Sequence, residues 1–174
     1  MPSSIENIFN RFLFPTIDPI IGTPDYASIA DIHPNLNSNA ASVQSNVRCG
    51  TLGLLFLTVS PVNYTTLSAI AFVPPVNPGP EPNIPDGATR AAIADLRYHH
   101  VVATNVFTEY ESTNKSLCQL LLASTDELYV RSLCHKYIGY CKTTTRALLD
   151  HVYSTYSSIS ASTLQNNDTR LQAP

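Results

Sequence analysis

The chain has 174 residues, of which 44% are hydrophobic and 13% are charged, and its formal net charge is −3. This length fits one domain, and the apolar content is enough for a buried core, which excludes a wholly disordered chain. The ten Lys and Arg residues are scattered without a basic run, which disfavours direct binding of nucleic acid by this segment. The longest apolar run, Leu52 to Val59, is far too short to span a bilayer, so no membrane partner is expected.

The first residues do not resemble a secretory signal, because Pro2, Glu6 and Arg11 interrupt any apolar stretch. We therefore expect a soluble protein of the cytoplasm. In that reducing compartment, cysteines are predicted to stay as free thiols. The chain has four of them, Cys49, Cys118, Cys134 and Cys141.

The N-terminal segment, residues 1–22, is predicted to be a flexible tail. Prolines at positions 2, 15 and 19 oppose a stable element, although residues 5–14 leave room for a short helix. The folded domain is then expected over 23–174.

The first helix of this domain should begin after Thr23, which can act as the N-cap, with Pro24 in the first helical position. An apolar stripe with steps of three and four residues follows. Because proline breaks or kinks a helix, Pro34 is predicted to divide this one into pieces near 24–33 and 35–46. The stripe comprises Ile29, His33, Leu36, Ala40, Val43 and Val47.

The middle of the chain holds a short apolar run, a helix start and a proline-rich stretch. The run at 54–57 fits either a buried helix or a strand. Ser60 followed by Pro61 repeats the cap-and-proline signal and predicts a helix over 61–71. Residues 73–87 contain six prolines and two glycines, which predicts an extended, polyproline-like loop.

The strongest pattern predicts one long helix over about 89–122, roughly 50 Å in length. Polar residues at 104–105 and 112–114 are the points where it would bend. A heptad stripe runs along it, with His100 and Asn114 as polar positions in the seam and His99 facing solvent. The stripe comprises Ile93, Leu96, His100, Ala103, Phe107, Tyr110, Asn114, Leu117 and Leu121. The expected core consists of Ile93, Leu96, Phe107, Tyr110, Leu117 and Leu121 with Leu148, Val152 and Tyr156.

Two shorter helices follow. Ser124 and Glu127 form a capping-box pattern, which predicts a short helix through about Cys134. Thr143 or Thr144 is expected to cap the next helix. With a marginal last segment over 163–171, every predicted element is helical. The expected fold is all-α, a multi-helix bundle with one long central helix and a proline-rich loop.

No catalytic, cofactor-binding or metal site is predicted, and the chain is not expected to be an enzyme. The sequence lacks the G-x-S-x-G, P-loop and G-x-G-x-x-G patterns. Zinc sites usually need pairs of ligands two to four residues apart. The cysteines near His135 and His151 do not have that spacing.

The stretch from Leu36 to Leu164 resembles the Gag proteins of copia-type long-terminal-repeat retrotransposons, and in particular the Gag-like reading frames of algal genomes. The resemblance rests on the order of several short motifs. They are Leu36-Asn37-Ser38-Asn39-Ala40, Gly50-Thr51-Leu52-Gly53-Leu54, Leu57-Thr58-Val59, Phe107-Thr108-Glu109-Tyr110, Leu117 to Leu122, Tyr129-Val130 and Thr145 to Tyr153.

The resemblance implies a capsid-like structural protein that self-associates into particles and packages element RNA. It implies RNA contact only through regions not found here, because a zinc knuckle and a second, C-terminal capsid domain are absent from the sequence. Four residues depart from the family pattern, Pro34, Cys118, Cys134 and Cys141. Such departures are typical of a truncated or degenerate copy. Domain family alone does not fix function.

A second hypothesis is a helical protein-interaction module that does not assemble. Its binding element would be the loop 73–87, where P-x-x-P frames occur at 75–78 and 82–85. Such segments can dock in aromatic grooves of partner domains. No small-molecule substrate is expected under either hypothesis.

Overall fold

The computed structural model describes residues 5–45 and 52–156. All regular elements in these residues are helices, which confirms the all-α prediction; one isolated antiparallel bridge joins His135 and Gly139. Cys49, Val47 and the segment 163–171 lie outside the described residues. The elements are α1 (Ile5–Phe9), α2 (Tyr26–Ser42), η2 (Leu55–Leu57), α3 (Pro61–Ser68), α4 (Arg90–Ser124), α5 (Glu127–Val130), η3 (Arg131–Leu133) and α6 (Thr145–Tyr156).

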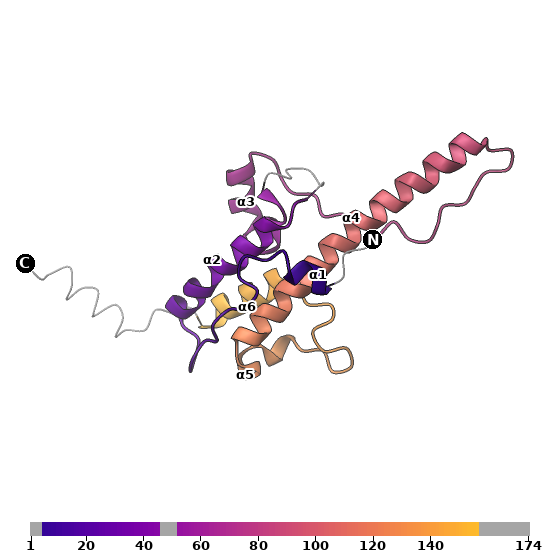
Figure 1. Cartoon of the computed structure of the whole chain (residues 1–174). Coiled ribbons are helices and arrows are strands. Elements are labelled where there is room, and N and C mark those ends of the chain that lie inside the picture. The colour runs from indigo at the N-terminus through magenta and orange to yellow at the C-terminus, as the bar shows by residue number, and fades with distance from the viewer. Residues whose placement is uncertain (1–4, 46–51, 157–174) are drawn as a thin grey trace, which may run out of the picture.

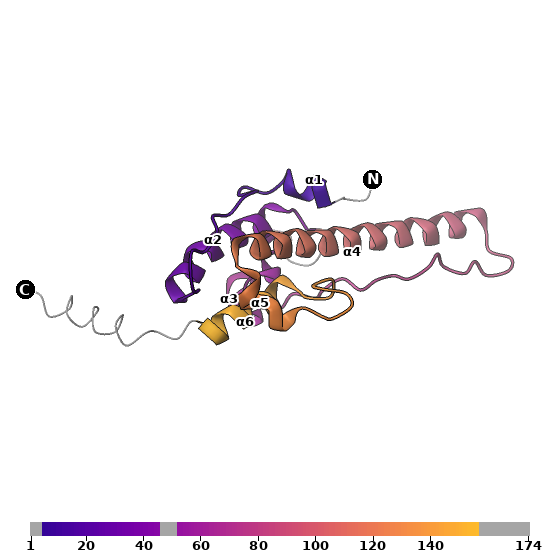
Figure 2. The ribbon, with the colours of Figure 1, turned by 90° about the horizontal axis from the view of Figure 1, so that it is seen from below.

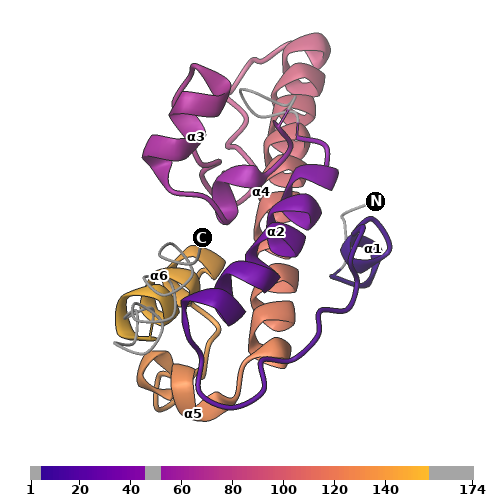
Figure 3. The same ribbon diagram turned by 90° about the vertical axis from the view of Figure 1, so that its left-hand side faces the viewer.

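The helices form a body around the C-terminal half of α4. Helices α1, α2 and α6 contact α4, and α2 also contacts α6. The N-terminal half of α4 leaves this body and projects from it, together with the loop that precedes it (Figures 1 and 2). When the left-hand side of Figure 1 faces the viewer, α1 and α6 lie on opposite sides of α4 (Figure 3).

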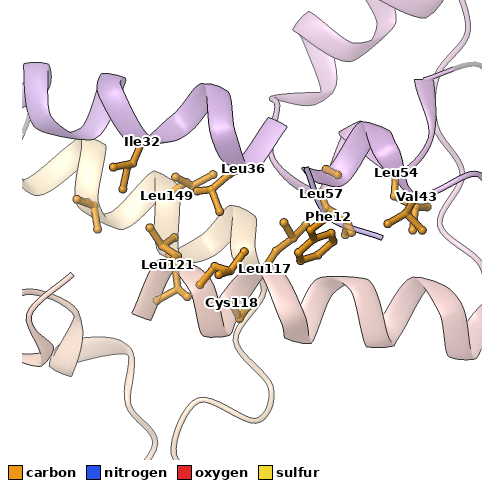
Figure 4. Close-up of a cluster of buried hydrophobic side chains, with 14 of the residues drawn as sticks. Phe12, Ile32, Leu36, Val43, Leu54, Leu57, Leu117, Cys118, Leu121 and Leu149 are labelled. Carbon is orange, nitrogen blue, oxygen red and sulfur yellow. The ribbon is translucent and has the colours of Figure 1, made fainter. Parts of the chain in front are cut away.

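The core lies where α2, α4 and α6 meet. Leu36 from α2, Leu117 and Leu121 from α4 and Leu149 from α6 point toward one another (Figure 4) and are fully buried. Burial of this kind is the main favourable term in folding, because apolar surface leaves water. The predicted core positions Leu117, Leu121, Leu148 and Val152 are confirmed, and Tyr110 and Tyr156 pack against them at partial burial.

The described part of the predicted tail, residues 5–22, packs on the body. Ile8 and Phe12 are buried in the core cluster. The side-chain amide of Asn39 binds the backbone of Phe14 at both ends, accepting from its N–H at 2.8 Å and donating to its carbonyl at 2.7 Å. The prolines do prevent a long helix, but an extended chain can still dock when another element satisfies its backbone groups.

Helix α2 is continuous, which contradicts the predicted break at Pro34. Proline removes one backbone hydrogen bond, but Ile29, Leu36 and Ala40 on either side of it are buried on one stripe. Packing of this stripe outweighs the local cost. The N-cap is also different from the prediction, because Asp25 rather than Thr23 accepts from the N–H of Ser28 and forms a capping box with it.

The middle of the chain follows the sequence reading closely. The apolar run 54–57, which from the sequence could be either a helix or a strand, contains the short 3-10 helix η2. Ser60 caps α3, with Pro61 in its first turn, and the helix ends at Ser68 where Ala69 adopts positive φ. The stretch 73–87 contains no helix, as predicted.

Helix α4 has no break at the predicted bend points, and Thr89 caps it by accepting from the N–H of Ala92. The predicted role of its N-terminal half in the core is wrong. Leu96 is exposed, and Ile93 and Phe107 are half-buried outside the core cluster.

One of the two C-terminal helices, α5, begins at a different residue from the one predicted. Ser124 is the last residue of α4, and the N-cap of α5 is Asp126, which accepts from the N–H of Leu128. For α6 the prediction is confirmed with Thr144, whose hydroxyl accepts from the N–H of Ala147 at 3.1 Å.

Candidate assembly surface

The part of the molecule that projects from the body is called here the arm. It consists of the proline-rich loop 73–89 and the helical residues 90–107 of α4 (Figure 2). At 1.5 Å per residue its helical part is about 27 Å long. Residues 90–107 contain no glycine or proline, so the sequence keeps the helix regular beyond the edge of the body.

The loop is held at two places, at the base of the arm and partway along it. At the base, Phe72 is buried and its ring stacks on Phe56 with centroids 4.6 Å apart. Along the arm, Glu81 forms an ion pair with Arg97 of α4 at 3.1 Å. Both partners of this pair are exposed, so it contributes little energy and mainly orients the chain.

The heptad stripe has the loop, rather than another helix, as its neighbour in the arm. Ile93, His100 and Ala103 are half-buried, although no helix packs beside them (Figures 1 and 2). The loop returns alongside α4 in this part of the molecule, where Glu81 reaches Arg97 (Figure 2). The position of His99 in solvent is as predicted, and it lies 3.3 Å from Asp95.

A second apolar side of α4 is exposed, and we call it the open face. It comprises Ala91, Ala94, Tyr98, Val101 and Val102. The steps 91, 94, 98 and 101 are three, four and three residues, so these side chains share one side of the helix. The exposed fractions of its large residues are 65% for Tyr98, 54% for Val101 and 40% for Val102.

An exposed apolar surface of this kind is informative because single exposed apolar residues are common, whereas contiguous ones mark interaction sites. The open face was not predicted from the sequence, because the heptad stripe with its larger apolar residues dominates the pattern. The sequence does contain a second series of apolar residues with heptad spacing, which begins at Ala91.

The charges of α4 differ between the tip and the base of the arm. On the helix, the tip carries Arg90 and Arg97 with Asp95. The base carries Glu109, which is paired with Arg11 of the N-terminal segment, and Glu111 one turn into the body. Arg90 is fully outside the body and Glu111 is half-buried.

The base of the arm is held by a buried polar contact between α4 and α6. The side-chain oxygen of Asn114 accepts hydrogen bonds from the backbone N–H and the hydroxyl of Thr145, both at 3.0 Å. The N–H of Thr145 lies in the first turn of α6 and has no partner within its own helix. Asn114 therefore fixes the register of α6 on α4, as the predicted role of a polar seam residue requires.

Two of the cysteines, Cys118 and Cys141, line one half-open pocket of about 250 Å³ together with Lys115 and Tyr140 among others. Cys118 is buried and donates to the carbonyl oxygen of Thr143 at 3.3 Å. Burial raises the pKa of the Cys118 thiol, so it stays protonated and is a poor nucleophile. Cys118, Cys134 and Cys141 are free cysteines, as predicted.

His135 and His151, the histidines close to the cysteines in the sequence, are not part of a metal-binding group. His151 contacts the carbonyl oxygen of Tyr129 and the hydroxyl of Ser132, both at 3.1 Å, and His135 takes part in the isolated bridge. Across residues 5–45 and 52–156, no three His, Cys, Asp or Glu side chains gather as metal ligands.

A half-buried histidine joins α2 to the C-cap of η2 and to α6. His33 donates from Nε2 to the carbonyl oxygen of Thr58 at 3.0 Å, and its Nδ1 accepts from the hydroxyl of Tyr153 at 2.9 Å. The roles follow because a carbonyl oxygen can only accept. Burial is the main cause that lowers the pKa of His33, and the nearby charge of Arg146 lowers it further.

No protein-family model, curated protein or solved structure matches the chain. Within the described residues, none of the helices is both long and apolar enough to cross a membrane.

Proposed function

We propose that the protein is a non-catalytic assembly protein that self-associates through the open face of its arm. The observation that carries the proposal is the exposure of Tyr98, Val101 and Val102 on a rigid helix that projects from the body. The arm adds little to the core of its own chain. A regular helix with an uncovered apolar side is typical of elements that pack on a partner.

The resemblance to the capsid part of copia-type Gag supports the same proposal independently of the arm. Under it, the protein is a structural component of particles in the cytoplasm, and element RNA is bound through other regions of a longer Gag. Exposed thiols such as Cys141 are compatible with that reducing compartment.

The test is the molar mass in solution, measured by light scattering behind a sizing column over a range of protein concentrations. The wild-type mass should rise above 19.0 kDa as concentration increases. Val101→Lys places a charge in the middle of the open face and should hold the mass near that of one chain, because burying an unpaired charge is costly.

A matched control is Val62→Lys on α3, since Val62 is also an exposed valine on a helix surface but lies outside the arm. It should associate like the wild type. A wild-type mass that stays at one chain at every concentration would refute the proposal. Equal loss in both variants would mean that association is a general property of the surface and not of the arm.

The second candidate is the protein-interaction module that uses the proline-rich loop. One observation favours it, because the loop is extended and exposes Val76 and Ile84 beside its prolines. Pro75→Ala with Pro78→Ala removes one P-x-x-P frame and should leave self-association unchanged if the open face is responsible. A monomeric wild type that binds an isolated aromatic-groove domain through these prolines would favour the module instead.

A further inference from the structure

We propose that the partner of the open face is the arm of a second copy, paired antiparallel about a two-fold axis near residues 100 and 101. This inference rests on the proposed function and specifies the geometry of its interface. Two copies of one surface form a closed pair when the surface is complementary to itself under a two-fold rotation. The arm must therefore match itself in both its apolar face and its charges.

The apolar match follows from the position of the axis. In an antiparallel pair, a residue before the axis lies level with one the same distance after it on the other copy. Tyr98 of one copy is then level with position 103 of the second copy. Val102 and Val101, one and two residues nearer the axis, are the open-face side chains against which it packs, and the reverse contact is made by symmetry. The small side chains of Ala91 and Ala94 let the tip of each arm approach the base of the other closely.

The charge match is the stronger argument, because it selects one direction. Arg90 and Glu111 are 21 positions apart, which is three heptads, so they lie along the same flank of α4. The antiparallel register places Arg90 of each copy level with Glu111 of the other and forms two ion pairs. A parallel pair would instead place Arg90 beside Arg90 and Glu111 beside Glu111.

Two further features agree with the antiparallel direction. The positive end of each α4 dipole, at Arg90, lies near the acidic base of the other arm, where negative charge is favoured. The two bodies also lie at opposite ends of the paired arms, because each arm projects from one end of its own body (Figure 2). The bodies then do not compete for the same space.

The test uses two charge-reversed variants of the full chain, Arg90→Glu and Glu111→Arg. Each variant alone creates two like-charge contacts in its own dimer and should weaken self-association about tenfold, with the weakening reduced at high salt. A mixture of the two variants forms a dimer in which both contacts are again between opposite charges. Mixing should restore affinity to within about threefold of the wild type.

This complementation cannot occur inside one chain, because residues 90 and 111 lie about 31 Å apart along the same helix. Glu111 is half-buried, so a second measurement leaves it unchanged. In Arg90→Lys, a carbodiimide should couple the new amine to the Glu111 carboxylate of another copy with loss of water. The expected product is a dimer whose cross-linked peptide joins positions 90 and 111.

The outcomes separate this inference from the proposed function. If the wild type associates and Val101→Lys abolishes association, but the mixed variants remain weak or the cross-link joins other positions, the antiparallel pairing is wrong and the assembly function stands. If the wild type stays at one chain, both are wrong.

Discussion

The C-terminal half of α4 is surrounded by α1, α2 and α6, whereas its N-terminal half has only an extended loop beside it. Leu117 and Leu121 are fully buried, but Leu96 and Tyr98 on the same helix are exposed. A heptad repeat thus specifies a helix with an apolar side without specifying what covers that side. The body supplies the cover within the chain, and under the proposed function the arm leaves it to a partner.

The largest expected difference between the two halves is in stability. Leu117→Ala removes a fully buried side chain and should lower the free energy of unfolding by about 2–5 kcal/mol, because a cavity adds to the lost apolar burial. The matched change in the arm, Leu96→Ala, should cost less than about 0.5 kcal/mol. Urea unfolding followed by circular dichroism measures both. Similar losses would mean that the arm is part of the cooperative core.

A polar pair gives the next largest contrast. Asn114→Ala leaves the buried N–H of Thr145 without its acceptor and should cost about 1–3 kcal/mol. Asn105 is exposed in the arm, and Asn105→Ala should change the free energy of unfolding by less than about 0.5 kcal/mol. If Asn114→Ala were equally mild, the contact between α4 and α6 would not hold the base of the arm.

The histidines distinguish the two regions by pH. Burial lowers the pKa of His33 below its ordinary value of 6.5, so the unfolded chain takes up this proton before the folded chain does. The stability linked to His33 is therefore fully present above pH 6.5 and is lost as the pH falls below it. Arg146, Asp150, Tyr26 and Tyr153 are the titratable or charged groups around this site.

Unfolding free energies measured between pH 7.5 and 5 should show this loss for the wild type. His33→Gln should flatten that part of the profile, since an amide keeps a donor and an acceptor but does not titrate. The exposed arm histidine serves as the control, and His99→Gln should leave the profile unchanged. An unaltered profile in His33→Gln would assign the acid sensitivity to other groups.

The smallest expected effect concerns the loop. Arg97→Ala breaks an exposed ion pair with Glu81 and should lower the free energy of unfolding by under about 1 kcal/mol. Arg146→Ala is the contrast in the body, because Arg146 donates to the carbonyl oxygen of Thr58 at 2.7 Å and pairs with Asp150. It should cost more than Arg97→Ala in the same unfolding assay.

The sequence predicted element types well, because caps and periodicity are local signals. Thr144 and Ser60 begin helices as expected, and α4 was located to within two residues at each end. The continuity of α2 through Pro34 was missed, since it depends on how well Leu36 and Ala40 pack in three dimensions. The docking of Phe14 on Asn39 was missed for the same reason, because the partners are 25 positions apart.

The candidate surface was harder to predict than the fold. Tyr98 and Val101 belong to a weaker series with small and β-branched residues, and nothing in the sequence says which of two apolar sides the chain itself will cover. The folded environment decides that, since Ile93 and His100 of the heptad stripe are half-buried whereas Tyr98 and Val101 of the open face are exposed.

The unbroken course of α4 from body to arm also has a mechanical consequence. A helix without a hinge behaves as a lever whose fulcrum is the contact of Asn114 with Thr145. The tip at Arg90 lies about 36 Å from that fulcrum along the helix, so a tilt of about 10° would carry it sideways by about 6 Å. In any array built from such arms, small changes in the packing of α6 on α4 would set the curvature of the whole array.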